Sequence, residues 1–241
     1  MQGKKKLFRT LGIIFFSIGI LVGMVMFIFM NWAYLEAYFF FGYSAPADKN
    51  LTTLRCPLLM TTSETGVVTI SLTNTTDRDL SPSIQTEISY YGAARLERAN
   101  HLLPAGETRK LSWMVTSDDM VFGHLVMARV YVFSTFTLPS RSNTCGTVVV
   151  NIPGWTGTEL FVTLLAFSLA CMAVGWGLWL GVSRPLQADG LIATRAMVIF
   201  TGVVLLGIIA GCYGWWGLGL VCTVASVLLI ITVVGYYIQN A

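Results

Sequence analysis

Charge is the property that this sequence has least of. Only 11% of its 241 residues are Asp, Glu, Lys or Arg, whereas an ordinary soluble domain has about 25%. Residues 196–241 contain no charged side chain at all. Soluble folds do not tolerate such a shortage over this length, so the composition indicates an integral membrane protein. The net charge of +3 is also too small to suggest a nucleic-acid partner.

Residues that carry chemistry are nearly as scarce. The sequence has two histidines and lacks a glycine-rich phosphate loop and a Gly-x-Ser-x-Gly motif. His124 follows the carboxylates Asp118 and Asp119, so one interpretation is a membrane enzyme that uses them, and the other is a solvated turn. No nucleophile or further metal ligand accompanies them in sequence. We therefore expect a non-enzymatic protein with no catalytic residue, metal or cofactor.

Four apolar stretches are long enough to cross a membrane. The first two, Leu11–Met30 and Leu160–Leu180, contain no charged residue. A single helix over residues 196–237 would be roughly 60 Å long, twice the hydrocarbon thickness of about 30 Å. This stretch must therefore fold back, and the bend is expected at Gly211–Gly217, where glycines and aromatic residues gather.

The basic residues predict the orientation of the spans. Lys4, Lys5, Lys6 and Arg9 precede the first span, and two arginines, Arg184 and Arg195, lie between the second and third. Four spans with a cytoplasmic N-terminus place both groups in the cytoplasm, in agreement with the positive-inside rule. Both termini are then cytoplasmic, and the segment between the first two spans lies outside the cytoplasm.

A cleaved signal peptide is the alternative for the first span. Ala45-Pro46-Ala47 fits a small-residue cleavage pattern. However, the apolar core exceeds the usual length of about 7–15 residues, and the candidate site lies far beyond it. These lengths favour an uncleaved anchor.

Aromatic residues crowd the segment that follows the first span. They are consistent with a belt at the outer membrane interface, or with a docking surface for another membrane subunit. We call this segment the collar, and its aromatic residues are Trp32, Tyr34, Tyr38, Phe39, Phe40, Phe41 and Tyr43.

Between about residues 51 and 156 the apolar pattern changes to a period of two. Val68, Ile70 and Leu72 alternate with polar residues, and similar alternation recurs over residues 84–90 and 125–136. Turn residues rich in Gly, Pro, Asn and Asp separate these runs. Short alternating strands over about 100 residues predict an antiparallel β-sandwich.

Two motifs in this region carry a resemblance to a known family. Residues 66–74, Gly-Val-Val-Thr-Ile-Ser-Leu-Thr-Asn, form a strand that ends in Asn before a turn, and residues 103–108, Leu-Pro-Ala-Gly-Glu-Thr, form a Pro-x-Gly-Glu turn before a later strand. The region resembles bacterial Ig-like sandwiches of the CARDB type. The resemblance covers well under half of the chain, and it implies a fold and partner binding but no chemistry.

The five cysteines fall into two groups. Three lie in or beside the spans, where a thiol behaves as a small apolar residue. Cys56 and Cys145 flank the β region, and the terminal strands of a sandwich often lie close together. Because the expected compartment is oxidising, we predict a Cys56–Cys145 disulfide, with two free thiols or a metal pair as the alternatives.

Two further patterns are short and frequent. Asn50 and Asn74 begin Asn-x-Thr sequences and are possible glycosylation sites. Gly19 with Gly23, and Gly207 with Gly211, are spaced four apart, which lets helices pack closely within the bundle or against a partner.

The expected fold is therefore membrane α plus all-β, with one transmembrane helix, an inserted Ig-like sandwich and three more helices. We expect a non-enzymatic accessory or scaffold subunit in the cell membrane, with the lipid bilayer and other membrane subunits as partners; a component of a transporter or channel is the alternative. The predicted segments are a basic N-terminus (1–10), transmembrane helix 1 (11–31), the collar (32–50), the sandwich (51–156), helix 2 (159–181), a cytoplasmic loop (182–195), helix 3 (196–212) and helix 4 (217–238).

Overall fold

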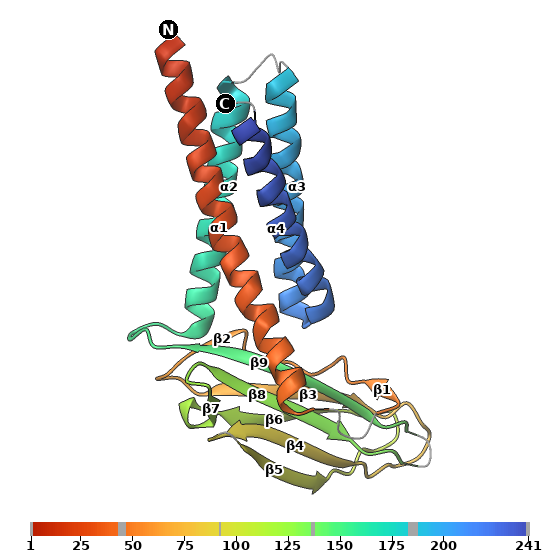
Figure 1. The fold of residues 1–241 in the computed structure, drawn as a ribbon. Coiled ribbons are helices and arrows are strands. Elements are labelled where there is room, and N and C mark those ends of the chain that lie inside the picture. Colours follow the sequence, from red (N-terminus) through yellow and green to blue (C-terminus); the bar gives the residue numbers. More distant parts are fainter. Residues whose placement is uncertain (1, 43–46, 92, 136–137, 183–187, 240–241) are drawn as a thin grey trace. The chain divides into compact units, whose positions relative to one another are not determined.

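The computed structural model describes residues 2–42, 47–91, 93–135, 138–182 and 188–239 (Figure 1). The chain forms two compact units, one made of Met1–Asn31 with Phe161–Ala241 and the other of Trp32–Leu160. The first unit is helical and the second contains all the strands of the described residues.

Four helices are long and apolar enough to cross a membrane. They are α1 (Gln2–Phe40), α2 (Gly157–Val182), α3 (Ala188–Tyr213) and α4 (Trp216–Gln239). The bend between α3 and α4 lies within Gly211–Gly217, where it was predicted. Gly214 has a φ of +71°, and the N–H of Trp215 donates to the carbonyl of Ala210 at 2.8 Å. This left-handed glycine cap ends α3 because it satisfies carbonyls that the helix leaves without partners.

Two helices extend beyond the predicted membrane spans. Helix α1 does not end at residue 31 but continues to Phe40, because residues 32–40 contain neither Gly nor Pro; it stops at Gly42, whose φ is +60°. Helix α3 begins at Ala188 rather than at 196, so the predicted loop of residues 182–195 is shorter. In both places polar or aromatic residues marked an expected membrane boundary that did not coincide with the end of the helix.

Small residues bring α1 and α2 into contact in the helical unit. A Cβ atom at Gly19 would lie 2.7 Å from the backbone nitrogen of Met172, and one at Gly175 would lie 2.6 Å from that of Phe16. The Ser168 hydroxyl donates to the carbonyl of Gly19 at 2.7 Å. Such close backbone approach is possible only where side chains are absent or small.

The other three glycines predicted to pack helices also lie between helices of this unit. Gly23 faces Val204 of α3, and the ring of Phe27 from α1 covers Gly207 at 2.8 Å from the position a Cβ would take. Gly211 contacts Met30. Phe27 is fully buried as a result, so α1 packs against both α2 and α3.

The β unit has two sheets. The larger sheet runs in the order β1-β9-β8-β4-β5, with β2 also on β9 and β7 also on β8, and the smaller sheet pairs β3 with β6. A one-turn helix, η1 (Ser117–Asp119), precedes β7. The strands are β1 (Lys49–Asn50), β2 (Leu59–Thr61), β3 (Gly66–Thr73), β4 (Ser83–Tyr90), β5 (Ala93–Asn100), β6 (Thr108–Val115), β7 (Met120–Val121), β8 (Leu125–Val132) and β9 (Arg141–Val150).

One feature of the predicted sandwich is wrong. The sheet is not wholly antiparallel, because β1 and β2 both pair with β9 in parallel. Parallel neighbours need a long connection, and here that connection is most of the domain.

Two hydrogen bonds hold the chain next to β1 in place: the hydroxyl and the backbone N–H of Ser140 both donate to the carboxylate of Asp48. These bonds lower the pKa of Asp48. Both bonds are therefore formed at neutral pH and are lost only as the pH falls through that lowered pKa.

Strand β8 is buried on both of its faces. Leu125 and Met127 on one face form a cluster with Ala33 and Ala37 from the last turns of α1. The alternate residues, Val126, Ala128, Val130 and Val132, are also buried and point to the opposite face, as side chains in a strand must. The end of α1 therefore shields one face of the larger sheet from solvent.

The close packing of α1 against β9 depends on one glycine. A Cβ at Gly146 would overlap the carbonyl group of Ala33. The helix backbone thus lies directly on the strand backbone, which brings Ala33 and Ala37 into full burial.

The first residue of α2 is also fixed to the β unit. Its Gly157 N–H donates to both carboxylate oxygens of Glu64, at 3.1 and 2.9 Å. Glu64 also accepts from the N–H of Thr61 in β2. A carboxylate at a helix N-terminus satisfies orphan N–H groups and interacts favourably with the helix dipole.

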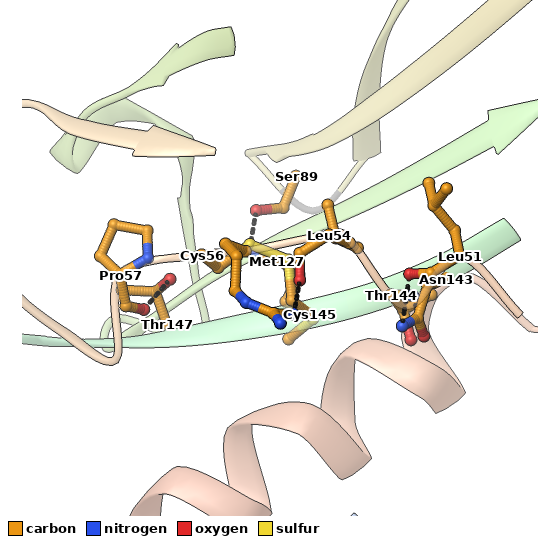
Figure 2. The surroundings of a disulfide bond; sticks show 11 residues. Leu51, Leu54, Cys56, Pro57, Ser89, Met127, Asn143, Thr144, Cys145 and Thr147 are labelled. Carbon is orange, nitrogen blue, oxygen red and sulfur yellow. Dashed lines mark hydrogen bonds between the residues drawn. A yellow bond between two sulfur atoms is a disulfide. The ribbon is translucent and has the colours of Figure 1, made fainter. Parts of the chain in front are cut away.

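The predicted disulfide is confirmed. Cys56 and Cys145 are bonded, 89 residues apart in sequence. Cys145 lies on β9, on the face opposite Gly146, while Cys56 follows Arg55, which bridges to Thr69 of β3. Figure 2 shows the bond among Leu54, Met127 and Ser89, with the Thr147 hydroxyl bonded to the Pro57 carbonyl nearby. The disulfide therefore links the larger sheet to the segment beside the smaller one.

We predict that Gly19→Ala destabilises the helical unit by about 1–3 kcal/mol, because the added methyl group meets backbone atoms of α2 that cannot move independently. Thermal unfolding of the full chain in detergent measures the effect. Gly177→Ala is the matched control in the same bundle, since nothing lies within 4 Å of that position. Equal melting temperatures for the two variants would contradict this packing.

Reduction of the Cys56–Cys145 bond should lower the free energy of unfolding of the β unit by about 4 kcal/mol, because the unfolded chain regains the entropy of a long loop. Thermal unfolding with and without reductant, together with mobility on non-reducing gels, measures this. The Cys56→Ser variant should be insensitive to reductant, whereas Cys212→Ser, at a free cysteine, should behave like the parent chain. A reductant-dependent shift that persists in Cys56→Ser would disprove the assignment.

Candidate interaction surface

The collar divides into a buried face and an exposed face. In the helix, Ala33 and Ala37 face the sheet, and Tyr34 is buried beside them. Trp32 and Phe39, seven residues apart and so on one side of the helix, are 51% and 66% exposed. Tyr38, Phe40 and Phe41 are half-buried, and Tyr43 lies outside the described residues. Part of the predicted collar therefore serves as a contact within this chain, with its own β unit.

Phe40 extends the collar to a turn of the β unit. Its ring meets that of Phe122 edge to face, with centroids 6.4 Å apart. Phe122 begins the connection between β7 and β8 and is 64% exposed. Its φ of 53° lies in the left-handed region, and Gly123 follows at 75°.

A second aromatic turn lies at the same end of the sheet. Tyr90, the last residue of β4, pairs with Ala93 of β5, so only two residues intervene. Tyr91 in this turn has a φ of 44° and is 74% exposed, and its ring packs against Tyr90 with centroids 4.5 Å apart. The antiparallel pairing of β4 with β8 puts the end of β4 beside the start of β8, as Figure 1 shows.

We name Tyr90, Tyr91 and Phe122 the aromatic turns. A bulky residue with positive φ costs about 1–2 kcal/mol relative to a residue that tolerates this backbone, such as Gly or Asn. Tyr91 and Phe122 adopt this unfavourable backbone conformation although their rings are mostly exposed to solvent. Burial of the rings therefore does little to offset the cost of the backbone conformation. Strained backbone of this kind is concentrated at functional sites. Sequence reasoning missed these residues, although a glycine follows both Tyr91 and Phe122, and glycine is common in turns.

The residues of the catalytic interpretation, His124, Asp118 and Asp119, each have separate surroundings. The carboxylate of Asp119 is buried and pairs with the guanidinium of Arg95 at 3.1 Å. It also accepts from the N–H of Thr116, which caps η1. Asp118 is exposed, and the His124 ring bonds through Nδ1 to the carbonyl of Phe122 at 2.6 Å. Asp119 therefore stabilises the fold, and the His124 contact stabilises the turn.

The described residues contain no group of three or more His, Cys, Asp or Glu side chains placed to hold a metal ion.

The helical unit has an apolar cavity of about 250 Å³. It lies among α1, α3 and α4, whereas the transport hypothesis expects one among the second, third and fourth spans. Its lining includes Phe16, Ile20, Met24, Phe200 and Ile230, and Ser17 is its polar member.

One polar side chain lies buried between α1, α3 and α4. The Nδ2 of Asn31 donates to the carbonyl of Phe27 at 2.7 Å and to that of Gly207 at 3.4 Å. Its Oδ1 is buried and has no hydrogen-bond donor among the described residues. It points at Gly219, where a Cβ would overlap it, an arrangement that suits a weak Cα–H···O contact. Asn31 thus fixes how three helices meet.

The two candidate glycosylation sites have different surroundings. Asn50 is exposed in β1. Asn74 is fully buried, and its Nδ2 donates to the carbonyls of Arg78, Leu103 and Pro104. A glycan on this nitrogen has no room in the folded domain, so Asn74 instead ties two turns together.

No protein-family model matches the sequence, and no curated protein matches it. Among solved structures, a CARDB domain from Pyrococcus furiosus is 12% identical over 41% of this chain and 90% of its own, with a TM-score of 0.32. A cycloisomaltooligosaccharide glucanotransferase from Paenibacillus is 13% identical over 44% of this chain and 15% of its own, with a TM-score of 0.33. A β-glucuronidase from Bacteroides uniformis is 15% identical over 40% and 12%, with a TM-score of 0.30. The chain matches only a small part of the two enzymes.

We predict that Asn74→Asp destabilises the β unit by about 3 kcal/mol or more, because a carboxylate would face three buried carbonyl oxygens and donate nothing. Asn50→Asp makes the same chemical change at an exposed position and should leave the melting temperature nearly unchanged. Thermal unfolding of both full-length variants in detergent compares them. A similar small effect at both positions would be inconsistent with the role given to Asn74.

Proposed function

We propose that this chain is a non-enzymatic, membrane-anchored accessory subunit whose Ig-like β domain binds another membrane subunit outside the cytoplasm. The observation that carries the proposal is the aromatic turns, where Tyr91 and Phe122 are exposed in a strained backbone. Exposed aromatic anchors on a rigid scaffold are typical of protein-binding surfaces. Phe39 and Trp32 add exposed aromatic area on the helix that packs on the same domain.

Two observations support the proposed orientation, in which the N-terminus is cytoplasmic and the β domain lies outside the cytoplasm. The basic residues before the first span and after the second favour a cytoplasmic N-terminus. The Cys56–Cys145 disulfide favours an oxidising compartment for the β unit. These arguments are independent, since one concerns the spans and the other the domain between them.

A component of a transporter or channel assembly is the second candidate. The apolar cavity of the helical unit is the observation that favours it, although this cavity lies among α1, α3 and α4 rather than among the second, third and fourth helices. Its lining is apolar, so it suits an acyl chain better than an ion or a polar solute. This candidate also requires partners, because one such cavity does not form a path.

The proposal is tested with a photo-reactive amino acid placed at position 91 or 122 of the full chain in its native membrane. Both positions should cross-link to one membrane protein, and that protein, when tagged, should retrieve this chain. Position 102 is the matched control, since Leu102 is 56% exposed but lies at the other end of β5. Tyr91→Asn and Phe122→Asn should reduce recovery of the partner without loss of stability, because Asn tolerates a positive φ. Cross-links at position 102 alone, or a chain that purifies only as a monomer with no cross-link, would refute the proposal.

A further inference from the structure

Strand β5 forms an open edge of the larger sheet. It pairs with β4 along all eight residues, Ala93–Asn100, and with no other strand among the described residues. Seven of its residues are exposed and Ala99 is half-buried, so neither of its faces is covered. Most edge strands are short, twisted or covered, because their free N–H and C=O groups can pair with another chain.

The hydrogen bonds around β4 show which groups of β5 point outward. The N–H of Phe133 donates to the carbonyl of Ser83, so odd-numbered residues of β4 bond to β8. The N–H of His101 donates to the carbonyl of Pro82, in step with the pairing of β4 and β5. Even-numbered residues of β4 therefore bond to odd-numbered residues of β5, since the two patterns alternate in an antiparallel sheet. The N–H and C=O groups of Ala94, Leu96 and Arg98 consequently face the open edge.

One antiparallel register of β5 with a second β5 satisfies both the hydrogen bonds and the charges. When Leu96 stands opposite Leu96 of the second copy, Ala94 stands opposite Arg98, and all of these residues have outward-facing backbone groups. Arg95 then stands opposite Glu97 on both sides of the two-fold axis. These are the non-hydrogen-bonded pairs, whose side chains approach most closely.

The charges on β5 thus oppose several other pairings and permit this one. A register centred on Arg95, Glu97 or Arg98 would set two like charges directly opposite each other. In the register centred on Leu96, no like charges are directly opposed. Arg95 already holds Asp119 at 3.1 Å, so its guanidinium is fixed near the edge. Arg98 lies over the Phe133 ring at 4.2 Å and does not block the approach.

We propose that β5 pairs with β5 of a second copy of this chain, antiparallel and centred on Leu96, to form one sheet continuous across a dimer. The proposal does not depend on the aromatic turns or on the proposed partner subunit. Two strands, β8 and β4, separate β5 from β9, the strand that leads into α2. The two copies of β9 therefore lie toward opposite edges of the joined sheet. Detergent suits the test because it imposes no common membrane plane on the two copies.

The test uses full-length protein in detergent with single cysteines at the edge. Leu96→Cys should form a disulfide-linked dimer under mild oxidation, since paired Cα atoms lie about 5.5 Å apart. Ala94→Cys alone should not, because the two copies of position 94 are about 14 Å apart along the strands. A mixture of Ala94→Cys and Arg98→Cys chains should cross-link, because those positions are opposed. The parent chain measures any background from the native cysteines.

The charges give a second measurement. In the Leu96→Cys background, Glu97→Arg should lower the dimer yield about tenfold, because two favourable pairs become two repulsive ones. Glu107→Arg makes the same charge change at an exposed turn residue and should have no effect. The proposal is overturned if Leu96→Cys cross-links no more than the parent chain. It is equally overturned if Ala94→Cys cross-links alone as well as Leu96→Cys does, or if Glu97→Arg and Glu107→Arg behave alike.

Discussion

The β unit depends on the contact between the backbone of α1 and the backbone of β9 at Gly146. Because this position has no side chain, the carbonyl of Ala33 lies against the strand, and Ala33 and Ala37 are fully buried. The contact allows the first part of β8, residues 125–128, to be apolar on both faces, one toward α1 and the other toward the interior of the domain. Without the helix, Leu125, Met127 and Val148 would expose a continuous apolar patch, which soluble surfaces avoid.

Strand β9 carries most of the remaining connections. It pairs with β8 on one side and with β1 and β2 on the other, holds the disulfide, and leads to α2. The two faces of β9 make different contacts, because Cys145 on one face forms the disulfide and Gly146 on the opposite face lies against α1. Glu64 then fixes the first residue of α2 beside β2. The strand that lies against α1 is therefore also the one with the most partners, while β5 has a single partner strand among the described residues and an open edge.

The sequence predicted the features that depend on long, uniform signals. The four apolar helices, the β region between the first two and the Cys56–Cys145 bond were all expected, because span length, charge and period two are read from many residues at once. Strand β5 was missed, since its charged, exposed residues have no apolar face to mark a strand. The extension of α1 to Phe40 was missed because aromatic residues suit an interface and a helix equally. The aromatic turns could not be assigned because backbone strain and exposure are three-dimensional properties, although the X-Gly dipeptides marked both turns.

The position of β9 at the end of the domain has a consequence for biosynthesis. β1 and β2 both pair with β9, which starts about 80 residues after the end of β2, and no other partner strand for them lies in the described part of the chain. During translation these strands have no partner strand until the ribosome has made residues 141–150. Non-local pairing of this kind is slow and leaves intermediates prone to aggregation. The domain is thus expected to stay open until the chain has been made up to the start of α2, which makes assistance from a chaperone most useful during that interval.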